Sequence, residues 1–319
     1  MRVVSTIDSL AEVEALLEAG VDELYGGCLP EAWEKRFSLL ASLNQRTFAG
    51  AQIDSLAELG EIVGRTHDRG RRLLITLNAP FYNDAQGPLL QDFVADCADA
   101  GVDGIILADL GLLRWLRSNF PNLEYHASTL AHLGNSAAVR FYLKQGVTSV
   151  ILPRHLTVAE LAAVVEGVPG VRCDAFLLVG KCPNSEGLCT HHHASPDKLW
   201  PCEIPYEIQA LEADSSPQLQ AAMLRQGSWS HSNRRHGCGL CAIPSLIKAG
   251  IGGVKLVGRG APTAQKVRNL LLVNDFLALA AEELDFSDYR RRARAAHRDR
   301  FGSPCSPNVC YYPEYYQED

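Results

Sequence analysis

Long apolar runs are absent from this sequence. No stretch of 18 or more consecutive apolar residues occurs, whereas a membrane-spanning helix needs about 20. The opening MRVVSTIDSL also lacks the order of basic, apolar and small residues that marks a secretory leader. We therefore expect no membrane span and a cytoplasmic protein.

An excess of positive charge is missing too. The chain has 30 lysines and arginines against 37 aspartates and glutamates, a formal net charge of -7. Proteins coated with basic surface for nucleic acid have the opposite balance, so the sequence carries no strong nucleic-acid signature. The run RRRARAAHRDR at residues 290–300 leaves a local basic patch open. Such a run on a terminal helix is more often a solvated face.

Hydrolase signatures are equally scarce. The sequence has no HExxH zinc motif and no Ser-His-Asp or Cys-His-Asn series in a recognisable context. A peptidase would need a zinc ion with an open coordination position and a carboxylate base beside it. We therefore rank a peptidase below redox chemistry.

One phrase recurs along the 319 residues: a helix closes on AG or QG and a short β-branched run follows. It reads EAGVDELYG, DAGVDGIILAD, KQGVTSVILPR and KAGIGGVKLVG. Repeated helix-then-strand units are typical of a parallel sheet. The pattern predicts eight strands, at residues 2–6, 22–26, 72–78, 104–108, 124–126, 149–152, 172–178 and 253–257. Eight such units favour a TIM-type (β/α)8 barrel over an open sheet.

The domain organisation follows from this pattern. Residues 1–285 are expected to form the barrel, closed by a long helix that begins after Pro262. A Cys-rich insertion at about 180–240 separates the seventh strand from the eighth, on the barrel face where active sites are built. Residues 286–319 are expected to form a C-terminal helix and tail.

Five of the ten cysteines lie in one stretch that starts at Cys182 and ends at Cys241. Six residues separate Cys182 from Cys189, twelve follow before Cys202, and 38 more precede Cys241, with Cys238 as a rival fourth member. Cytoplasmic cysteines stay reduced, so a tight group indicates metal binding or catalysis more than disulfides. Thiolates gathered from separate loops hold zinc or an iron-sulfur cluster, and we favour a cluster.

The same stretch resembles peptidase family U32, the collagenase-like group. Its relatives include the oxygen-independent hydroxylation proteins of ubiquinone biosynthesis and of ribosomal and transfer RNA modification. The family hallmark C-x4-G-x-C is similar to CPNSEGLC at 182–189, and the family's PCRWKYEL to PCEIPYEI at 201–208. Further similar segments are YHASTLAHLGNSAAVRFYLKQGVTSVILPR at 125–154, LCAIPSLIKAG at 240–250 and KLVGR at 255–259.

The resemblance implies a [4Fe-4S] cluster, with ligands Cys182, Cys189, Cys202 and Cys241. Four thiolates satisfy such a cluster, which then serves electron transfer or structure. If Cys238 or Cys241 does not ligate, an exposed iron could act as a Lewis acid. The alternative is zinc on the same thiolates, because Cys238-x2-Cys241 with His231 or His236 nearby also suits zinc.

Residues at the carboxyl ends of the predicted strands are candidates for substrate handling, because TIM barrels build their sites there. They are Asn78, Asp109, His126, Ser128, Thr129, Arg154 and Arg259. His126 is a candidate general acid or base, with a structural, hydrogen-bonded histidine as the alternative. Arg154 and Arg259 are candidates for binding a carboxylate or phosphate, and backbone N–H groups at 258–260 would assist; pairing to barrel carboxylates is the alternative. An anion site is consistent with prephenate, the dicarboxylate oxygen donor that the resemblance implies.

The remaining reactive side chains have no assigned partner. The tract from His191 to His193 could ligate metal or move protons, although three consecutive histidines rarely all face a site. Cys28 is expected to be inert, with a substitute cluster ligand or a persulfide carrier as alternatives. Cys305 and Cys310 form a C-x4-C pair that could bind metal, act as a redox pair or do neither. Two further cysteines are expected in the core, Cys97 and Cys173.

The sequence and the resemblance together predict an iron-sulfur enzyme that hydroxylates or otherwise modifies an RNA base or a small aromatic molecule without O2. Arg154, Arg259 and His126 would handle this substrate. Two alternatives remain open. One is a metal-dependent peptidase, and the other is a non-catalytic, cluster-bearing subunit that partners a related chain.

Overall fold

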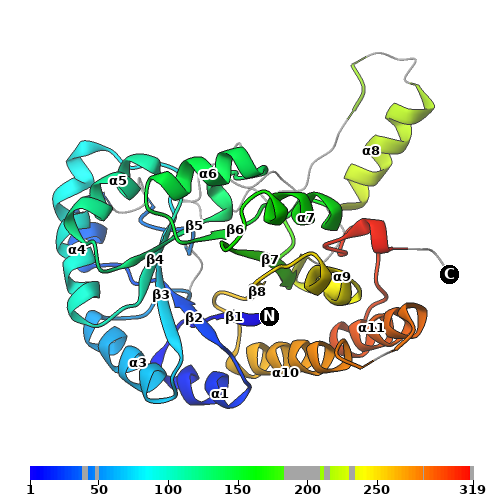
Figure 1. Ribbon diagram of the computed structural model, residues 1–319, viewed down its shortest axis with the longest axis horizontal. Helices are drawn as coiled ribbons and strands as arrows, with labels where there is room; N and C mark the ends of the chain where they lie inside the picture. Colours follow the sequence, from blue (N-terminus) through cyan, green and yellow to red (C-terminus); the bar gives the residue numbers. More distant parts are fainter. Residues whose placement is uncertain are drawn as a thin grey trace.

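The structure, a computed structural model, describes residues 1–37, 42–46, 50–182, 209–211, 216–229, 234–282 and 284–316. Eight parallel strands pair in sequence order and close with β8 beside β1 (Figure 1). The strands are β1 (Arg2–Thr6), β2 (Glu23–Gly26), β3 (Arg72–Leu77), β4 (Gly104–Leu107), β5 (Glu124–Ala127), β6 (Ser149–Ile151), β7 (Arg172–Leu178) and β8 (Gly253–Leu256). The predicted TIM barrel is confirmed, and every strand boundary lies within one residue of its predicted position.

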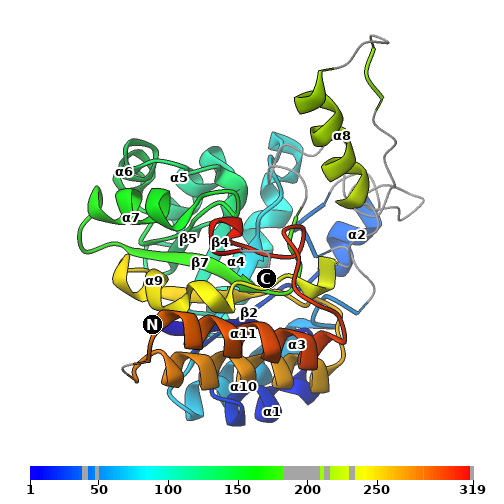
Figure 2. The same cartoon turned by 90° about the vertical axis from the view of Figure 1, so that its right-hand side faces the viewer.

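Most helices follow a strand and cover the outside of the barrel. The described helices are α1 (Val13–Glu18), α2 (Glu31–Phe37), α3 (Leu56–Asp68), α4 (Gly87–Asp99), α5 (Leu110–Asn119), α6 (Ser136–Lys144), α7 (Val158–Glu166), α8 (Pro217–Trp229), α9 (Ile243–Lys248), α10 (Thr263–Leu279) and α11 (Phe286–Phe301). Helix α8 stands away from the barrel (Figure 1), while α10 and α11 lie side by side along one flank (Figure 2). In the described residues, none of the helices combines the length and apolarity needed to span a membrane.

The recurring glycine explains how each repeat turns from helix to strand. Gly20, Gly101, Gly146 and Gly250 have φ values of 84°, 84°, 104° and 76°. A side chain with a Cβ atom is disfavoured in this left-handed region, so glycine ends the helix at low cost. After Gly20, the N–H of Asp22 donates to the carbonyl of Val3, which starts the next strand pair.

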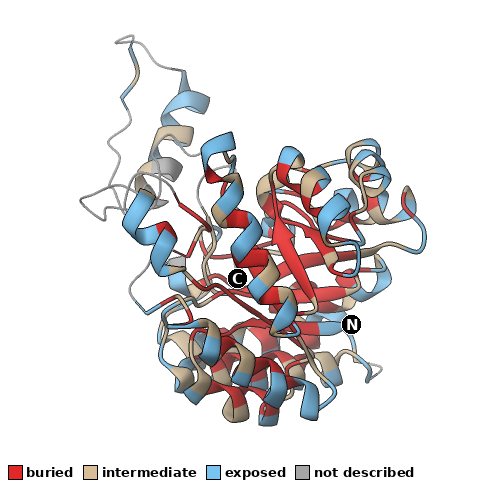
Figure 3. Cartoon of the chain, turned by 90° about the vertical axis from the view of Figure 1, so that its left-hand side faces the viewer, coloured by how far each residue is buried: buried red, intermediate tan, exposed pale blue. Residues whose placement is uncertain are grey.

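The barrel interior is apolar in part and strongly charged toward the amino-terminal ends of the strands. The strands form the buried centre of the molecule (Figure 3). Arg172, the first residue of β7, donates to Glu23 Oε2 at 2.7 Å and to Asp174 Oδ2 at 2.6 Å. Both acids are almost fully buried, so each needs this guanidinium partner. This ionic layer fixes one end of the barrel and leaves the other end for a site.

The C-terminal tail packs on the barrel at the end of β7. Tyr311 and Tyr312 donate their hydroxyl groups to the carbonyls of Val179 and Phe176, at 2.6 Å and 2.7 Å. Glu314 accepts from the N–H of Val158, the first residue of α7, at 2.7 Å. The tail therefore supports the strand that leads into the Cys-rich segment.

Candidate active site at the barrel mouth

The centre of the candidate site is Tyr25 on β2. Its side chain points into the barrel and its hydroxyl donates to the carbonyl of Leu256 at 2.9 Å. The amine nitrogen of Lys255 lies 3.7 Å from the centre of the Tyr25 ring, and the Arg46 guanidinium lies 5.6 Å from it. Cations attract the face of an aromatic ring, and this attraction strengthens away from water.

Lys255 is buried in this group, and burial lowers the pKa of its amine to about 7. The negative charges of Asp174 and Glu23 act in the opposite direction and raise this pKa. A buried ammonium is costly because it leaves water without full compensation. Its amine therefore titrates near neutral pH, unlike an exposed lysine.

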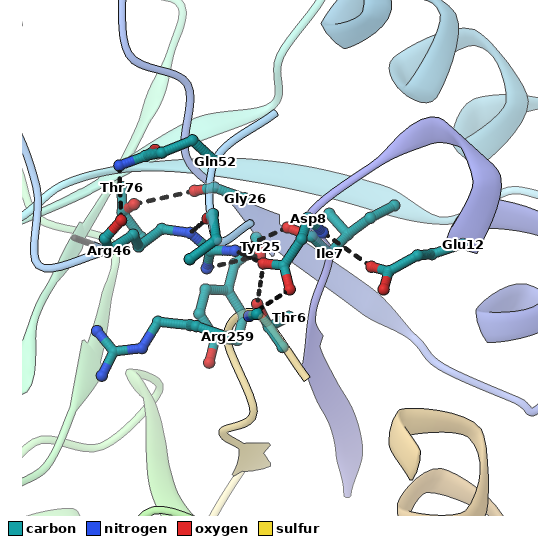
Figure 4. Close-up of polar contacts among 12 residues, drawn as sticks. Thr6, Ile7, Asp8, Glu12, Tyr25, Gly26, Arg46, Gln52, Thr76 and Arg259 are labelled. Carbon is teal, nitrogen blue, oxygen red and sulfur yellow. Dashed lines mark hydrogen bonds and ion pairs between the residues drawn. The ribbon is translucent and has the colours of Figure 1, made fainter. Parts of the chain in front are cut away.

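A buried ionic network lies beside Tyr25 and was not foreseen from the sequence (Figure 4). Asp8, just after β1, contacts the charged groups of both Arg46 and Lys266. Lys266 on α10 also lies 2.7 Å from Glu12, and Arg46 donates to the carbonyl of Ala51 at 2.7 Å. Two acids thus balance two bases, which is the condition for burying charge. The sequence signal for it was a carboxylate two residues after the first strand.

This network also corrects an expectation about the loop at 258–260. The N–H of Gly260 donates to Asp8 at 2.6 Å, and the N–H of Ala261 donates to Gly258 at 3.0 Å. The Gly260 N–H is therefore committed to an internal carboxylate and does not serve an external anion.

The two predicted arginines both lie at this mouth. The Arg154 guanidinium stacks 3.7 Å from the centre of the Phe176 ring of β7, and Arg259 donates to the carbonyl of Gln45. Burial raises the pKa of Tyr25, while Arg46, Arg259 and Arg154 act in the opposite direction. Three guanidinium groups thus act on one buried phenol, and both predicted arginines remain partly exposed.

His126 does not join this group. Its ring nitrogen Nε2 lies 3.3 Å from Oε2 of Glu124, the first residue of β5, and the imidazole is 2% exposed. Hydrogen bonding to His126, followed by Arg72, lowers the pKa of Glu124 to about 2. The structure therefore places His126 with the ion pairs at the amino-terminal end of the barrel.

The other strand-end candidates have structural partners. Asp109 accepts from the N–H of Leu112 at 2.7 Å and caps α5, while Ser128 accepts from the N–H of Leu130. The Asn78 side chain accepts from the N–H of Gln45 at 3.1 Å, and the Thr129 hydroxyl faces the Leu152 carbonyl at 3.5 Å. Each of these four side chains therefore has a partner within the protein.

Two of the four predicted cluster ligands can be located. Cys182 follows β7, and Cys241 lies in a short helical turn, Leu240–Ala242; both are half-buried. A backbone hydrogen bond of 2.7 Å from Val179 to Gly237 joins the two segments. The other two predicted ligands, Cys189 and Cys202, lie outside the described residues, as do the histidines at 191–193 and His231.

The rival ligand Cys238 is more deeply placed. It is 4% exposed, and its backbone forms bridges with Leu178 and with Cys310. Burial raises the pKa of the Cys238 thiol and raises that of Cys241 to about 11. His236 instead pairs with the Ser303 hydroxyl at 3.0 Å. Among the described residues, no three His, Cys, Asp or Glu side chains are placed to hold a metal ion.

The thiols Cys182 and Cys241 nevertheless fit the donor chemistry of an iron-sulfur centre. Both are half-buried and carried by hydrogen-bonded segments at the end of one strand. Cys28, in contrast, is 2% exposed, and burial raises its pKa to about 11. Two more free thiols are fully buried, as expected, Cys97 and Cys173.

Comparison with known proteins gives a consistent result. Residues 8–307 of this chain match the profile of the family described as "Peptidase family U32". The tRNA hydroxylation protein P of Haemophilus influenzae is 27% identical over 188 residues, which cover 59% of this chain and 38% of that protein. The 23S rRNA 5-hydroxycytidine synthase of Escherichia coli is 25% identical over 213 residues, which cover 65% of this chain and 30% of that protein.

The chain spans less than half the length of these relatives. Among solved structures, the U32 peptidase Mk0906 has the same barrel fold, with a TM-score of 0.53 and 14% identity. The alignment covers 82% of this chain and 94% of that one. Because the family profile matches nearly all of its sequence, this chain belongs to peptidase family U32.

Proposed function

We propose that this chain takes part in O2-independent hydroxylation, or a related modification, of an RNA base. The [4Fe-4S] cluster that we propose for it has four cysteine ligands, Cys182, Cys189, Cys202 and Cys241. The relatives named for tRNA hydroxylation and for 5-hydroxycytidine synthesis support the reaction class. Because the chain spans only part of the length of these relatives, an RNA substrate for this chain is itself part of the proposal.

The observation that carries the proposal is the dual role of β7. Phe176 on this strand holds the Arg154 guanidinium at the barrel mouth, and Cys182 follows on the same strand's exit. One strand therefore links a cationic edge of the barrel mouth to a proposed cluster ligand. An anionic substrate part suits such an edge, because guanidinium groups bind carboxylate or phosphate at two points.

The described residues account for binding and positioning. Arg154 and Arg259 would bind the anionic group, and Tyr25 keeps its proton because burial raises its pKa. The buried network of Asp8, Arg46 and Lys266 holds the surrounding loops in place. A [4Fe-4S] cluster, when bound, supplies one-electron transfer. Prephenate would fit the same arginines as a dicarboxylate oxygen donor.

The cofactor is tested on anaerobically purified protein by its absorption spectrum and by iron, sulfide and zinc analysis. We expect a brown protein with about four iron atoms per chain, and loss of iron in Cys182→Ser, Cys202→Ser and Cys241→Ser. Cys97→Ser is the matched control and should keep its iron. A colourless protein with about one zinc ion per chain would contradict the cluster and favour the peptidase.

The reaction is tested by mass spectrometry of nucleosides from total RNA of cells that lack the gene. We expect one hydroxylated nucleoside to be lost and to return with the wild-type chain but not with Arg154→Ala. An unchanged nucleoside profile, together with zinc-dependent peptide release from gelatin, would support the peptidase. Activity only after a related second chain co-purifies would indicate the partner-subunit role.

A further inference from the structure

The tail after α11 brings two more cysteines close to Cys238 and Cys241. Residues 306–310 form one helical turn, in which the N–H of Cys310 donates to the carbonyl of Ser306 at 3.0 Å. Cys305 precedes this turn and Cys310 ends it. One pocket is lined by all four cysteines together with His297 and Arg294. The family profile ends at residue 307, so it does not extend to Cys310.

The side chains of Cys305 and Cys310 both line this pocket and lie within interaction distance of each other. Cys305 is half-buried, whereas Cys310 is 6% exposed and also donates to the carbonyl of Tyr312 at 3.3 Å. The two side chains are thus neighbours in one pocket, and Cys305 is the more exposed of the two. A disulfide requires this proximity, because its bond length is only about 2 Å.

The backbone around the pair is held in place by the barrel. The N–H of Cys238 donates to the carbonyl of Val309, and the N–H of Tyr311 donates to the carbonyl of Cys238, both at 2.8 Å. The amine of Lys181 contacts the carbonyls of Pro307, at 3.1 Å, and of Cys310. These bonds anchor the backbone of the turn to the barrel.

We propose that Cys305 and Cys310 are a redox-active dithiol that small-molecule disulfides such as oxidised glutathione convert to an intrachain disulfide. The Cys305 thiolate attacks one sulfur of the reagent, forms a mixed disulfide and releases one thiolate. The Cys310 thiol then loses its proton and attacks the Cys305 sulfur, which releases the second thiolate. The pair gives up two electrons, and the reagent is reduced to two thiols.

The unequal exposure of the two sulfurs assigns their roles. A reagent in solution reaches the half-buried Cys305 first, while Cys310 lies behind it and resolves the mixed disulfide. The disulfide would form in the segment whose backbone pairs with Cys238, and Cys238 lies three residues before Cys241. The proposal requires no metal and does not rest on the proposed hydroxylation.

The test uses the full chain, incubated with oxidised glutathione and blocked with N-ethylmaleimide before and after denaturation. Peptide mapping without reduction should show Cys305 linked to Cys310, with both thiols free in the untreated protein. Cys310→Ser should instead retain glutathione on Cys305, and Cys305→Ser should leave Cys310 unmodified. Cys97→Ala, altered on the distant helix α4, should form the link as the wild type does.

Other products would overturn the proposal. Treated wild-type protein with Cys305 and Cys310 both free would show that the pair is not redox-active. A link from either residue to Cys238 or Cys241 would show that Cys305 and Cys310 are not the reacting pair. Because mapping of the wild-type chain alone decides between these results, the test does not depend on the folding of any variant.

Discussion

The amine nitrogen of Lys255 lies 3.7 Å from the centre of the Tyr25 ring, inside the barrel and away from bulk water. The two residues come from β8 and β2, which both neighbour β1. This contact places a titratable amine at the centre of the candidate site. Burial lowers its pKa to about 7, so its protonation changes across the physiological range.

Lys255→Met should therefore change how stability depends on pH. Between pH ~7 and ~10 the unfolded wild-type chain binds a proton at this lysine that the folded chain does not, so wild-type stability rises with pH there. The variant lacks this effect, and its stability relative to wild type should fall by up to about 1.4 kcal/mol per pH unit over that window. Urea unfolding at several pH values measures the free energy of unfolding of both proteins. If this free energy changes with pH in the same way in both, the lowered pKa of Lys255 is contradicted.

Asp8→Ala should destabilise the fold strongly. The substitution leaves Arg46 and Lys266 buried with less compensating charge, and removing one partner of a buried ion pair costs about 3–5 kcal/mol. Glu31→Ala is the control, because it removes only the exposed pair with Lys35 and should change stability by less than about 1 kcal/mol. Similar urea midpoints for the two variants would show that the network is not stabilising.

Arg154→Lys should lower activity while preserving the fold. Lysine keeps the positive charge but loses the planar guanidinium that stacks 3.7 Å from the Phe176 ring centre and binds anions at two points. We expect a drop of about tenfold in the modified nucleoside, corresponding to about 1.4 kcal/mol of binding, with unchanged iron content. Arg291→Lys, on the exposed face of α11, is the matched control. Equal activity of the two variants would show that Arg154 does not bind the substrate.

His126→Gln should lower stability and spare activity per folded molecule. The imidazole contacts Glu124 within the ionic layer at the amino-terminal end of the barrel. Loss of a hydrogen bond to a charged group costs about 1.5–3 kcal/mol. Thermal melting and nucleoside analysis would be compared in the same preparations. A tenfold loss of product with unchanged melting would instead support the general acid or base that the sequence suggested.

His297→Leu should leave stability unchanged or raise it. Its ring is 1% exposed, and among the described residues neither ring nitrogen has a hydrogen-bond partner. A buried polar group without a partner costs about 1–3 kcal/mol, which an apolar side chain avoids. Burial lowers the pKa of this imidazole to about 4, so the ring is neutral near pH 7. A clear loss of stability on urea unfolding would show that His297 binds a partner outside the described residues.

The sequence predicted the strands well because each signal is local. A helix that closes on glycine and a β-branched run that follows define one repeat, and Gly20 has the positive φ that this interpretation required. Arg154 and Arg259 were also predictable, since residues after barrel strands face the mouth. Cys97 and Cys173 were correctly expected in the core.

Other features depend on residues that are far apart in the chain. Asp8, Arg46 and Lys266 meet only when the barrel closes, and nothing near any one of them signals the other two. His126 follows the same strand-end rule as Arg154, yet its side chain pairs with Glu124 toward the opposite end. The rule gives the position along the strand but not the direction in which a long side chain leans.

The sequence by itself determined the repeat, the barrel and the family, because periodicity and ordered motifs are properties of the chain. Only the tertiary structure decided which charges share a buried network, that the Gly260 N–H is used by Asp8, and that Cys305 and Cys310 share one pocket. The physical reason is that burial and pairing energies depend on atoms brought together by packing, and packing is set by the whole fold rather than by any local segment.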